Sequence, residues 1–340
     1  MIGFLRRLHG NRARAALYGR CLAPPVHLIV LRYHAVAETG DADRYVHPGL
    51  SVSPARFREQ VRLLVRRFHV VTADEIPELL ATGDAGAARG SRTPAALITF
   101  DDGYRDNHDM ATPILVDERA SATFFVATAP LEPGRFFWVS ELRGMVKSLP
   151  AGTLRLPGAT DAFKVPRTGP GRDRVSRDLT RYLSALAATE RETAMDELAR
   201  AAGLPRGAEL DGTWLRPSDL LAMAAAGMII GAHTVTHPHL DRVAPAHMQA
   251  EVAGSRSALE RILARPVEHF AYPNPGGGGR FTGAGRDAVQ AAAFRTAFTS
   301  SPERLAPGVD LLRLPRLGVN RGDAERALFD RLTRFAEHAG

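Results

Sequence analysis

Short apolar runs alternate with amphipathic helical patterns along the chain, and this alternation limits the fold more than any other feature. Several of the runs are continuously apolar, as expected of strands that helices cover on both faces. Strands that alternate with helices form parallel sheets or barrels. Seven runs read as strands: His27–Tyr33, His69–Thr72, Ala95–Phe100, Ala122–Ala127, Met228–Ala232, His269–Tyr272 and Arg295–Thr299. The count predicts an α/β barrel or near-barrel.

The helices between these runs have recognisable starts. Ser53 stands before Pro54, which puts a capping side chain ahead of a proline at the first helical position. A second helix is predicted over Pro245–Leu263. The first helix should bury one face made of Phe57, Val61, Leu64 and Val65.

One stretch, at about residues 132–212, interrupts the alternation and lacks convincing strands. Residues 150–171 are rich in Pro and Gly, and a helix is predicted over residues 174–188. A second helix should open at Thr189, with Glu192 three residues later completing a capping box. We interpret the stretch as an insertion on one strand–helix loop, serving as a lid or a substrate-facing subdomain.

Composition limits the partners and the chemistry. The 340 residues include 44 Lys or Arg and 37 Asp or Glu, so the formal net charge is +7. No stripe of interleaved aromatic and basic residues accompanies this charge, which argues against nucleic-acid binding. Cys21 is the single cysteine, so neither an intramolecular disulfide nor a cysteine-based zinc site can form.

Residues 1–25 form a basic N-terminal arm ahead of the predicted domain at 26–340. Arginines interrupt every apolar stretch before it reaches the length of a secretory signal. The arm is therefore predicted to be a basic amphipathic helix. Peripheral contact with a membrane surface and packing on the domain both remain open. A cytoplasmic address, peripheral to the inner face of the membrane if the arm binds it, is the resulting expectation.

Two adjacent carboxylates follow the buried run Ala95–Phe100. Asp101 and Asp102 precede Gly103, which lets the backbone turn, and active sites gather where parallel strands end. Neighbouring carboxylates repel one another unless a cation or a proton relieves them. A simple Asp-Gly turn that caps a helix is the alternative. Asp106, which comes next, is expected to cap that helix and face solvent.

Two histidines follow another strand. Met228–Ala232 runs into His233 and His237, whose spacing lets both rings meet one ion if the segment makes a helical turn. Two neutral histidines and one carboxylate are a common set of metal ligands that leaves room for water and substrate. A lone histidine pair is usually structural. The two strand ends taken together favour a metal site.

These two motifs together resemble the polysaccharide deacetylase family, the family 4 carbohydrate esterases that share the NodB homology domain. The motifs are Thr-Phe-Asp-Asp-Gly-Tyr at 99–104 and His-Thr-Val-Thr-His at 233–237. The resemblance spans roughly residues 27–320 and implies a distorted (β/α)7 barrel with a helical insertion. Three further segments support it: Tyr33–Val36, Phe270–Asn274 and Leu314–Val319.

The resemblance also implies a role for each motif residue. Asp101 would be the general base, while Asp102, His233 and His237 would hold a divalent metal, usually Zn²⁺ and in some members Co²⁺ or Ni²⁺. The ion would polarise the amide carbonyl and acidify a water. A backbone N–H within the turn formed by Tyr272, Pro273 and Asn274 would stabilise the oxyanion.

Two positions depart from the family pattern. Many members have an arginine that pairs with the base, and Ala271 stands at that position here. Many also supply a late histidine as general acid, and after His269 the chain has only His338. His34, at the end of the first strand, or Arg316 could fill one of these catalytic roles.

The function expected is metal-dependent removal of N-acetyl groups from an amino sugar. The substrate would be a polysaccharide, an oligosaccharide, or a glycolipid such as a lipid-linked glycan precursor. A deformylase, or another hydrolase of linear non-peptide amides, is one alternative, because such a site selects a bond type. A metal-binding pseudoenzyme that recognises glycan without turnover is another, supported by the two departures and opposed by the retained Asp101.

Overall fold

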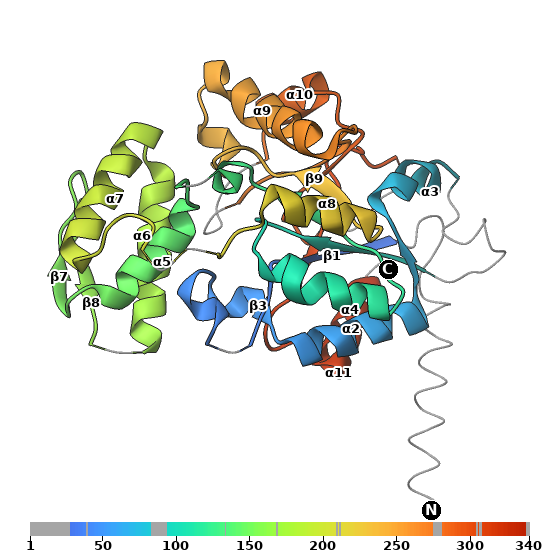
Figure 1. Ribbon diagram of the computed structural model, residues 1–340, viewed down its shortest axis with the longest axis horizontal. Coiled ribbons are helices and arrows are strands. Elements are labelled where there is room, and N and C mark those ends of the chain that lie inside the picture. The colour runs from blue at the N-terminus through green and yellow to red at the C-terminus, as the bar shows by residue number, and fades with distance from the viewer. Residues whose placement is uncertain are drawn as a thin grey trace, which may run out of the picture.

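An eight-stranded sheet, curled into a half-barrel, forms the centre of the computed structural model (Figure 1). The strand order is β11-β10-β9-β6-β5-β1-β12, and β4 pairs with β5 beside this path. Neighbouring strands run parallel. The strands are β1 Leu28–Tyr33, β4 His69–Val71, β5 Ala95–Phe100, β6 Thr123–Val126, β9 Ile229–Ala232, β10 His269–Ala271, β11 Thr296–Phe298 and β12 Leu317–Gly318.

The structure describes most of the chain between residues 28 and 337. The basic arm at 1–25 and His338 therefore lie outside the described residues. The described ranges are 28–38, 40–82, 94–132, 134–167, 169–208, 210, 212–274, 281–303, 305 and 308–337.

Each of the seven predicted runs contains one strand of the sheet, and the run Ala95–Phe100 coincides with β5. The prediction missed β12, because a strand of two residues has no periodicity to detect. It also missed the short parallel pair of β2 (Ala35–Val36) and β3 (Ser51–Val52) beside the barrel mouth. The fold class, a distorted (β/α)7 barrel, is confirmed.

Helices surround the sheet (Figure 1). In α2 the Ser53 hydroxyl accepts a hydrogen bond from the Arg56 N–H, as the capping pattern predicts. The prediction that one face of α2 is buried is confirmed for Phe57, Val61 and Leu64, whereas Val65 is 43% exposed. No helix in the described ranges is both long and apolar enough to span a bilayer. The helices that surround the sheet are α2 Pro54–Arg67, α3 Ile76–Thr82, α4 Thr112–Asp117, α8 Pro217–Ala225, α9 Pro245–Leu263, α10 Gly283–Ala291 and α11 Glu325–Glu337.

The interruption of the barrel pattern forms a separate lobe beside the barrel (Figure 1). The lobe buries its own apolar cluster, which is distinct from the clusters of the barrel. The expectation that the stretch contains no strands is wrong, because β7 and β8 pair as a short antiparallel hairpin. Its elements are α5 Trp138–Ser148, β7 Gly152–Leu154, β8 Phe163–Val165, α6 Pro170–Ala185 and α7 Ala188–Ala202.

The capping box predicted for the second helix of the lobe is displaced by two residues. The Ala187 N–H donates to the Glu190 carboxylate at 3.1 Å, and α7 begins at Ala188. Glu192 instead accepts a hydrogen bond from Arg206 at 3.0 Å. The predicted Thr189–Glu192 pair therefore does not cap the helix, because tertiary contact with Arg206 claims the Glu192 carboxylate.

Side chains of β1 alternate between the two faces of the sheet, as its backbone period requires. Leu31 and Tyr33 belong to the cluster that packs under the helices. Leu28 and Val30 belong to a second cluster, with residues of β4, β5, β6, β10 and β11, which fills the barrel interior. The next residue on the interior face is Arg32, at the carboxyl end of the strand where the barrel opens.

Asp106 is buried, so the expectation that it faces solvent is wrong. Its carboxylate accepts hydrogen bonds from the Tyr45 hydroxyl at 2.6 Å, the Val36 N–H at 2.8 Å and the Asn107 amide at 2.9 Å. The Asn107 amide also donates to the His34 carbonyl at 2.8 Å. Asp106 thereby ties the segment after β5 to the segment after β1, and both segments form the barrel mouth.

We predict that replacing Asp106 with Asn changes how stability depends on pH. Burial raises the pKa of Asp106 to about 6, although its hydrogen bonds oppose the shift. The unfolded value is about 4, so the stabilising contribution of this group is complete below pH 4 and is lost as the pH rises through 6. The free energy of unfolding of the parent minus that of Asp106→Asn should fall by up to about 3 kcal/mol between pH 4 and 7. Urea titrations that give a pH-independent difference would contradict this.

Candidate active site

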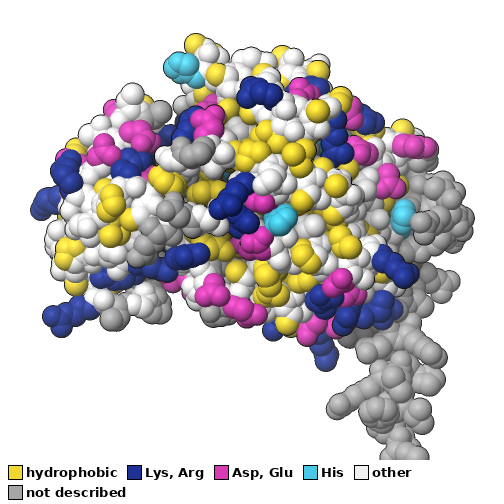
Figure 2. Space-filling model, viewed as in Figure 1, with side chains coloured by type: hydrophobic (Ala, Val, Ile, Leu, Met, Phe, Trp, Pro, Cys, Tyr) yellow, Lys and Arg dark blue, Asp and Glu magenta, His cyan; other side chains and the backbone are white. Residues whose placement is uncertain are grey.

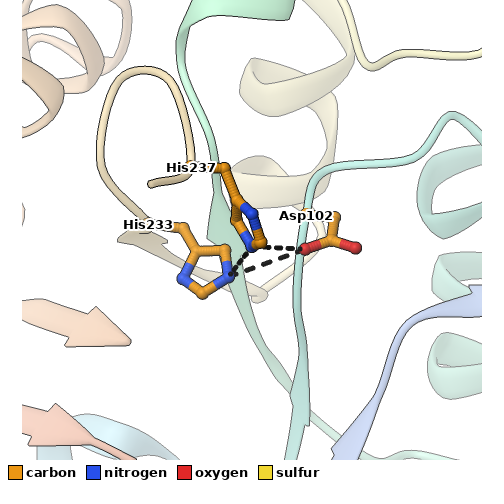
Figure 3. Close-up of side chains that lie close together, drawn as sticks. All are labelled: Asp102, His233 and His237. Atoms are coloured by element: carbon orange, nitrogen blue, oxygen red, sulfur yellow. Dashed lines mark hydrogen bonds and ion pairs between the residues drawn. The ribbon is translucent and has the colours of Figure 1, made fainter. Parts of the chain in front are cut away.

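Three buried side chains converge at the barrel mouth, as Figure 3 shows. His233 Nε2 lies 3.6 Å from Asp102 Oδ1, and His237 Nε2 lies 3.3 Å from the same oxygen. The two Nε2 atoms are 3.2 Å apart. The residues that the two sequence motifs single out are therefore brought together from β5 and β9.

This arrangement fits a small divalent cation. A tetrahedral ion bound at 2.0–2.2 Å places its ligand atoms about 3.3 Å from one another, close to the separations found here. The His233 Nδ1–H donates to the Ala271 carbonyl at 2.7 Å, so the Nε2 lone pair of His233 faces the other two ligands. Neutral imidazoles and a carboxylate are also the right chemistry for such an ion.

The backbone at these ligands is held in uncommon conformations. Asp102 has φ +83° and is followed by Gly103 at φ +89°, where a Cβ atom would come within 2.9 Å of Val126. Thr234 and His237 have φ +67° and +55°. Half of the six described non-glycine residues with positive φ thus belong to this site, which is where proteins tend to hold strain.

The two histidines meet across a loop, not the helical turn that their spacing suggested. The Thr234 hydroxyl accepts from the His237 N–H at 3.1 Å. Glu251 on α9 accepts from the N–H groups of Val235 and Thr236, at 3.0 and 2.9 Å, and from the Thr236 hydroxyl at 2.6 Å. Glu251 positions the ligand loop, and sequence analysis missed it because one acid on a helix carries no signal.

Arg316 forms a bidentate ion pair with Asp101. Its Nη1 and Nη2 lie 2.6 and 2.8 Å from the two carboxylate oxygens, and both side chains are buried. Arg316 Nε donates to the Thr299 carbonyl at 2.9 Å. Burial is the largest single influence and would raise the pKa of Asp101, but the charge and hydrogen bonds of Arg316, together with the nearby His233 and His34, lower that pKa to about 2. Asp101 is therefore held ionised and fixed in orientation.

One of the two departures from the family pattern, the missing arginine, has a structural explanation. Ala271 cannot pair with Asp101, but its carbonyl orients His233, and Arg316 supplies the missing guanidinium from another strand end. His34 lies in the wall of the site, where burial lowers its pKa to about 4. Its Nδ1 atom has no hydrogen-bond partner among the described residues.

Of the three residues expected near the oxyanion, only Asn274 lines the pocket that contains Asp101 and Asp102. The Tyr272 N–H donates to the Phe298 carbonyl at 2.9 Å, and its hydroxyl donates to the Leu312 carbonyl at 2.9 Å. Proline has no N–H, so Pro273 cannot donate. Asn274 lies in the wall of the pocket, while Tyr272 and Pro273 line a smaller neighbouring cavity.

The site opens into a pocket of about 350 Å³. The lobe supplies part of its wall through Arg143, Ser176, Arg177 and Thr180. The face shown in Figure 2 is hollowed where the lobe meets the barrel, and charged side chains of both signs are scattered over it. Sequence analysis predicted a substrate-facing insertion but none of these residues. It also missed Arg32, on β1, and Tyr45, Val46 and His47, on the loop that follows β2.

Comparison of the sequence with family models gives one decisive match. The polysaccharide deacetylase model matches residues 88–148 and 183–296, which is just over half of the chain. This chain belongs to the polysaccharide deacetylase family. The unmatched residues between the two segments, 149–182, fall within the lobe. No curated protein matches the sequence.

Solved structures share the fold at low sequence identity. The Streptococcus pyogenes deacetylase PplD, in complex with acetate, is 18% identical with a TM-score of 0.61, over 91% of this chain and 99% of that one. IcaB from Ammonifex degensii is 18% identical with a TM-score of 0.55, over 92% and 97%. The polysaccharide deacetylase BC0361 from Bacillus cereus is 16% identical with a TM-score of 0.55, over 90% and 68%. These likenesses show that this chain shares the fold of the three structures.

We predict that Arg316→Met strongly destabilises the chain, because it leaves the Asp101 charge buried without its partner. The loss should be roughly 3–5 kcal/mol in the free energy of unfolding. Adding Asp101→Asn should recover more than about 1 kcal/mol by removing that charge. Arg62→Met, at an exposed pair with Glu118, is the matched control and should cost less than about 1 kcal/mol. Urea unfolding measures the wild type and the three variants. A double variant no more stable than Arg316→Met would refute the account.

Proposed function

We propose that this chain is a divalent-metal-dependent hydrolase that removes N-acetyl groups from an amino sugar in a polysaccharide, oligosaccharide or lipid-linked glycan. One observation carries the proposal. The buried set of Asp102, His233 and His237 stands at the floor of a pocket, directly beside the ionised carboxylate of Asp101. A cation-binding set next to a fixed proton acceptor is what hydrolysis of an unactivated amide requires.

The residues divide the work of hydrolysis. A divalent ion held by Asp102, His233 and His237 would polarise the amide carbonyl and make water a better nucleophile. Asp101, held by Arg316, accepts a proton from the attacking water and delivers it to the leaving nitrogen. A C–O bond forms, the C–N bond breaks, and the products are a carboxylate and the free amine of the sugar. Zinc suits the nitrogen and oxygen ligands, and Co²⁺ or Ni²⁺ could replace it.

Two further side chains are assigned roles at the reacting group. Asn274, which lines the pocket, is the member of the Tyr272–Asn274 turn proposed to stabilise the oxyanion. His34 is proposed to hydrogen-bond the substrate beside the leaving nitrogen, because it lies in the same wall with an unpartnered Nδ1 atom.

The Asp101–Arg316 pair favours an enzyme over a glycan-binding pseudoenzyme. The missing arginine and the missing late histidine supported a pseudoenzyme, and Arg316 supplies a guanidinium in place of that arginine. A protein that only binds glycan has no need of a buried carboxylate fixed by two hydrogen bonds. Contact of the arm at 1–25 with a membrane, and the cytoplasmic address, remain predictions.

Metal content and acetate release test the proposal together. Elemental analysis of the purified chain should find about one divalent ion per chain, and N-acetylglucosamine oligomers should release acetate. Asp101→Asn should keep the metal and lose at least about 100-fold in kcat/KM. His233→Ala combined with His237→Ala should lose both metal and activity.

His247→Ala is the matched control, because His247 is exposed and lies outside the pocket. It should retain both metal and activity. A parallel panel of N-formyl sugars separates a deformylase from a deacetylase. Wild-type chain that takes up no metal, or Asp101→Asn with full activity, would refute the proposal.

A further inference from the structure

Arg32 is a partly buried cation without a partner among the described residues. Its Nε atom is buried and unbonded, and its guanidinium makes no hydrogen bond or ion pair with any part of the chain that the structure describes. Burial lowers the pKa of Arg32, as does the nearby charge of Arg316, but a guanidinium remains protonated at neutral pH. A charge that is largely withdrawn from water is normally paired, so an unpaired guanidinium in a pocket wall points to an anionic ligand.

The backbone makes room for this guanidinium. Arg32 lies at the carboxyl end of β1, on the face that lines the barrel mouth, and it forms part of the pocket wall. On the neighbouring strand, β12, a Cβ atom at Gly318 would come within 3.2 Å of Arg32 Nη2. Glycine at this position thus lets the guanidinium lie close against the strand.

The acids near Arg32 are already engaged. Asp101 is paired with both terminal nitrogens of Arg316. Asp102 Oδ1 lies 3.3 Å from His237 Nε2 and 3.6 Å from His233 Nε2, and Asp102 is one of the proposed metal ligands. With a divalent ion in place, the ion and Arg316 already balance the negative charges of Asp101 and Asp102. The positive charge of Arg32 is then left without a counter-charge. An oxyanion of the substrate could balance it with bidentate hydrogen bonds.

The rim of the same pocket also presents donors that lack an acceptor. His47 Nδ1 lies 3.1 Å from the Gly49 N–H, and His47 Nε2 lies 3.0 Å from Arg177 Nη1. Burial, followed by the charges of Arg143 and Arg177, lowers the pKa of His47, so the ring carries a single proton at neutral pH. If Nδ1 holds that proton, it faces the Gly49 N–H, and if Nε2 holds it, it faces an N–H of Arg177. In either case two hydrogen-bond donors point at one another. An acceptor oxygen between His47 and Arg177 would relieve this opposition.

We propose that Arg32 is the floor of an oxyanion subsite, and that the substrate is an acidic N-acetylated sugar. The anion is a phosphate or a carboxylate carried by the sugar near its N-acetyl group. Arg177 and His47 extend the same preference to the rim. This inference rests on the proposed function, because it names the class of sugar which that site accepts.

Binding of the deacetylated products tests the subsite without requiring turnover. Calorimetry compares glucosamine 1-phosphate with glucosamine, each titrated into the zinc-loaded chain. The phosphate should bind at least about tenfold more tightly. Arg32→Gln should abolish that preference and Arg32→Lys should retain part of it. Gly318→Ala, which keeps the charge but crowds the guanidinium, should weaken it.

Arg181→Gln is the matched control, because Arg181 lies on α6 with its side chain 70% exposed and outside the pocket. It should keep the full preference, and thermal melting should verify that every variant is folded. Equal binding of the two sugars by the wild type, or an unchanged preference in Arg32→Gln, would overturn the inference. Sodium acetate that abolishes the preference without competing for zinc would also overturn it, by assigning Arg32 to the released product.

Activity measurements separate this inference from the proposed function. The ratio of kcat/KM for N-acetylglucosamine 1-phosphate, or for the carboxylate sugar N-acetylmuramic acid, to that for N-acetylglucosamine should exceed about ten. Equal release of acetate from all three would contradict the inference while leaving deacetylation intact. A preserved phosphate preference in binding, with no acetate from any sugar, would contradict the proposed function alone.

Discussion

The buried ion pair between Arg316 and Asp101 is the interaction on which the rest of the site depends. Among the described residues, Arg316 is the largest side chain that is fully buried, and it donates hydrogen bonds to Asp101, the Thr299 carbonyl and the Thr99 hydroxyl. These partners follow or belong to β5 and β11, while Arg316 itself leads into β12. The pair therefore joins strands on both sides of the barrel mouth, and it holds Asp101 ionised next to the proposed metal ligands.

Around that pair, residues of the proposed metal site are held in strained backbone conformations. Asp102 and His237 adopt left-handed conformations that cost free energy, and such conformations persist only where surrounding contacts impose them. Those contacts are visible here in Gly103 packed against Val126, and in the bonds that Glu251 makes to the ligand loop. The carboxylate of Asp102 and the two imidazoles are therefore preorganised for the proposed ion.

The sequence predicted the strands and the grouping of Asp102 with the two histidines because both depend on short-range patterns. Seven apolar runs marked the strands, and the shared carboxyl edge of the parallel sheet brought Asp102, after β5, near His233, after β9. The partner of Asp101 could only be guessed, because Arg316 lies 215 residues away and no local pattern links them. The bond of Glu251 to the histidine loop, and the solitary charge of Arg32, likewise arise from tertiary packing. Burial of Asp106 was missed for the same reason.

Anomalous diffraction at the zinc absorption edge tests the central claim most directly. Crystals of zinc-loaded chain should show one strong peak, about 2.0–2.2 Å from Asp102 Oδ1 and from the Nε2 atoms of His233 and His237. Asp101 should remain paired with Arg316 and outside the ligand set. Absence of the peak at full zinc occupancy in solution, or a peak bound by Asp101 in place of Asp102, would contradict the account.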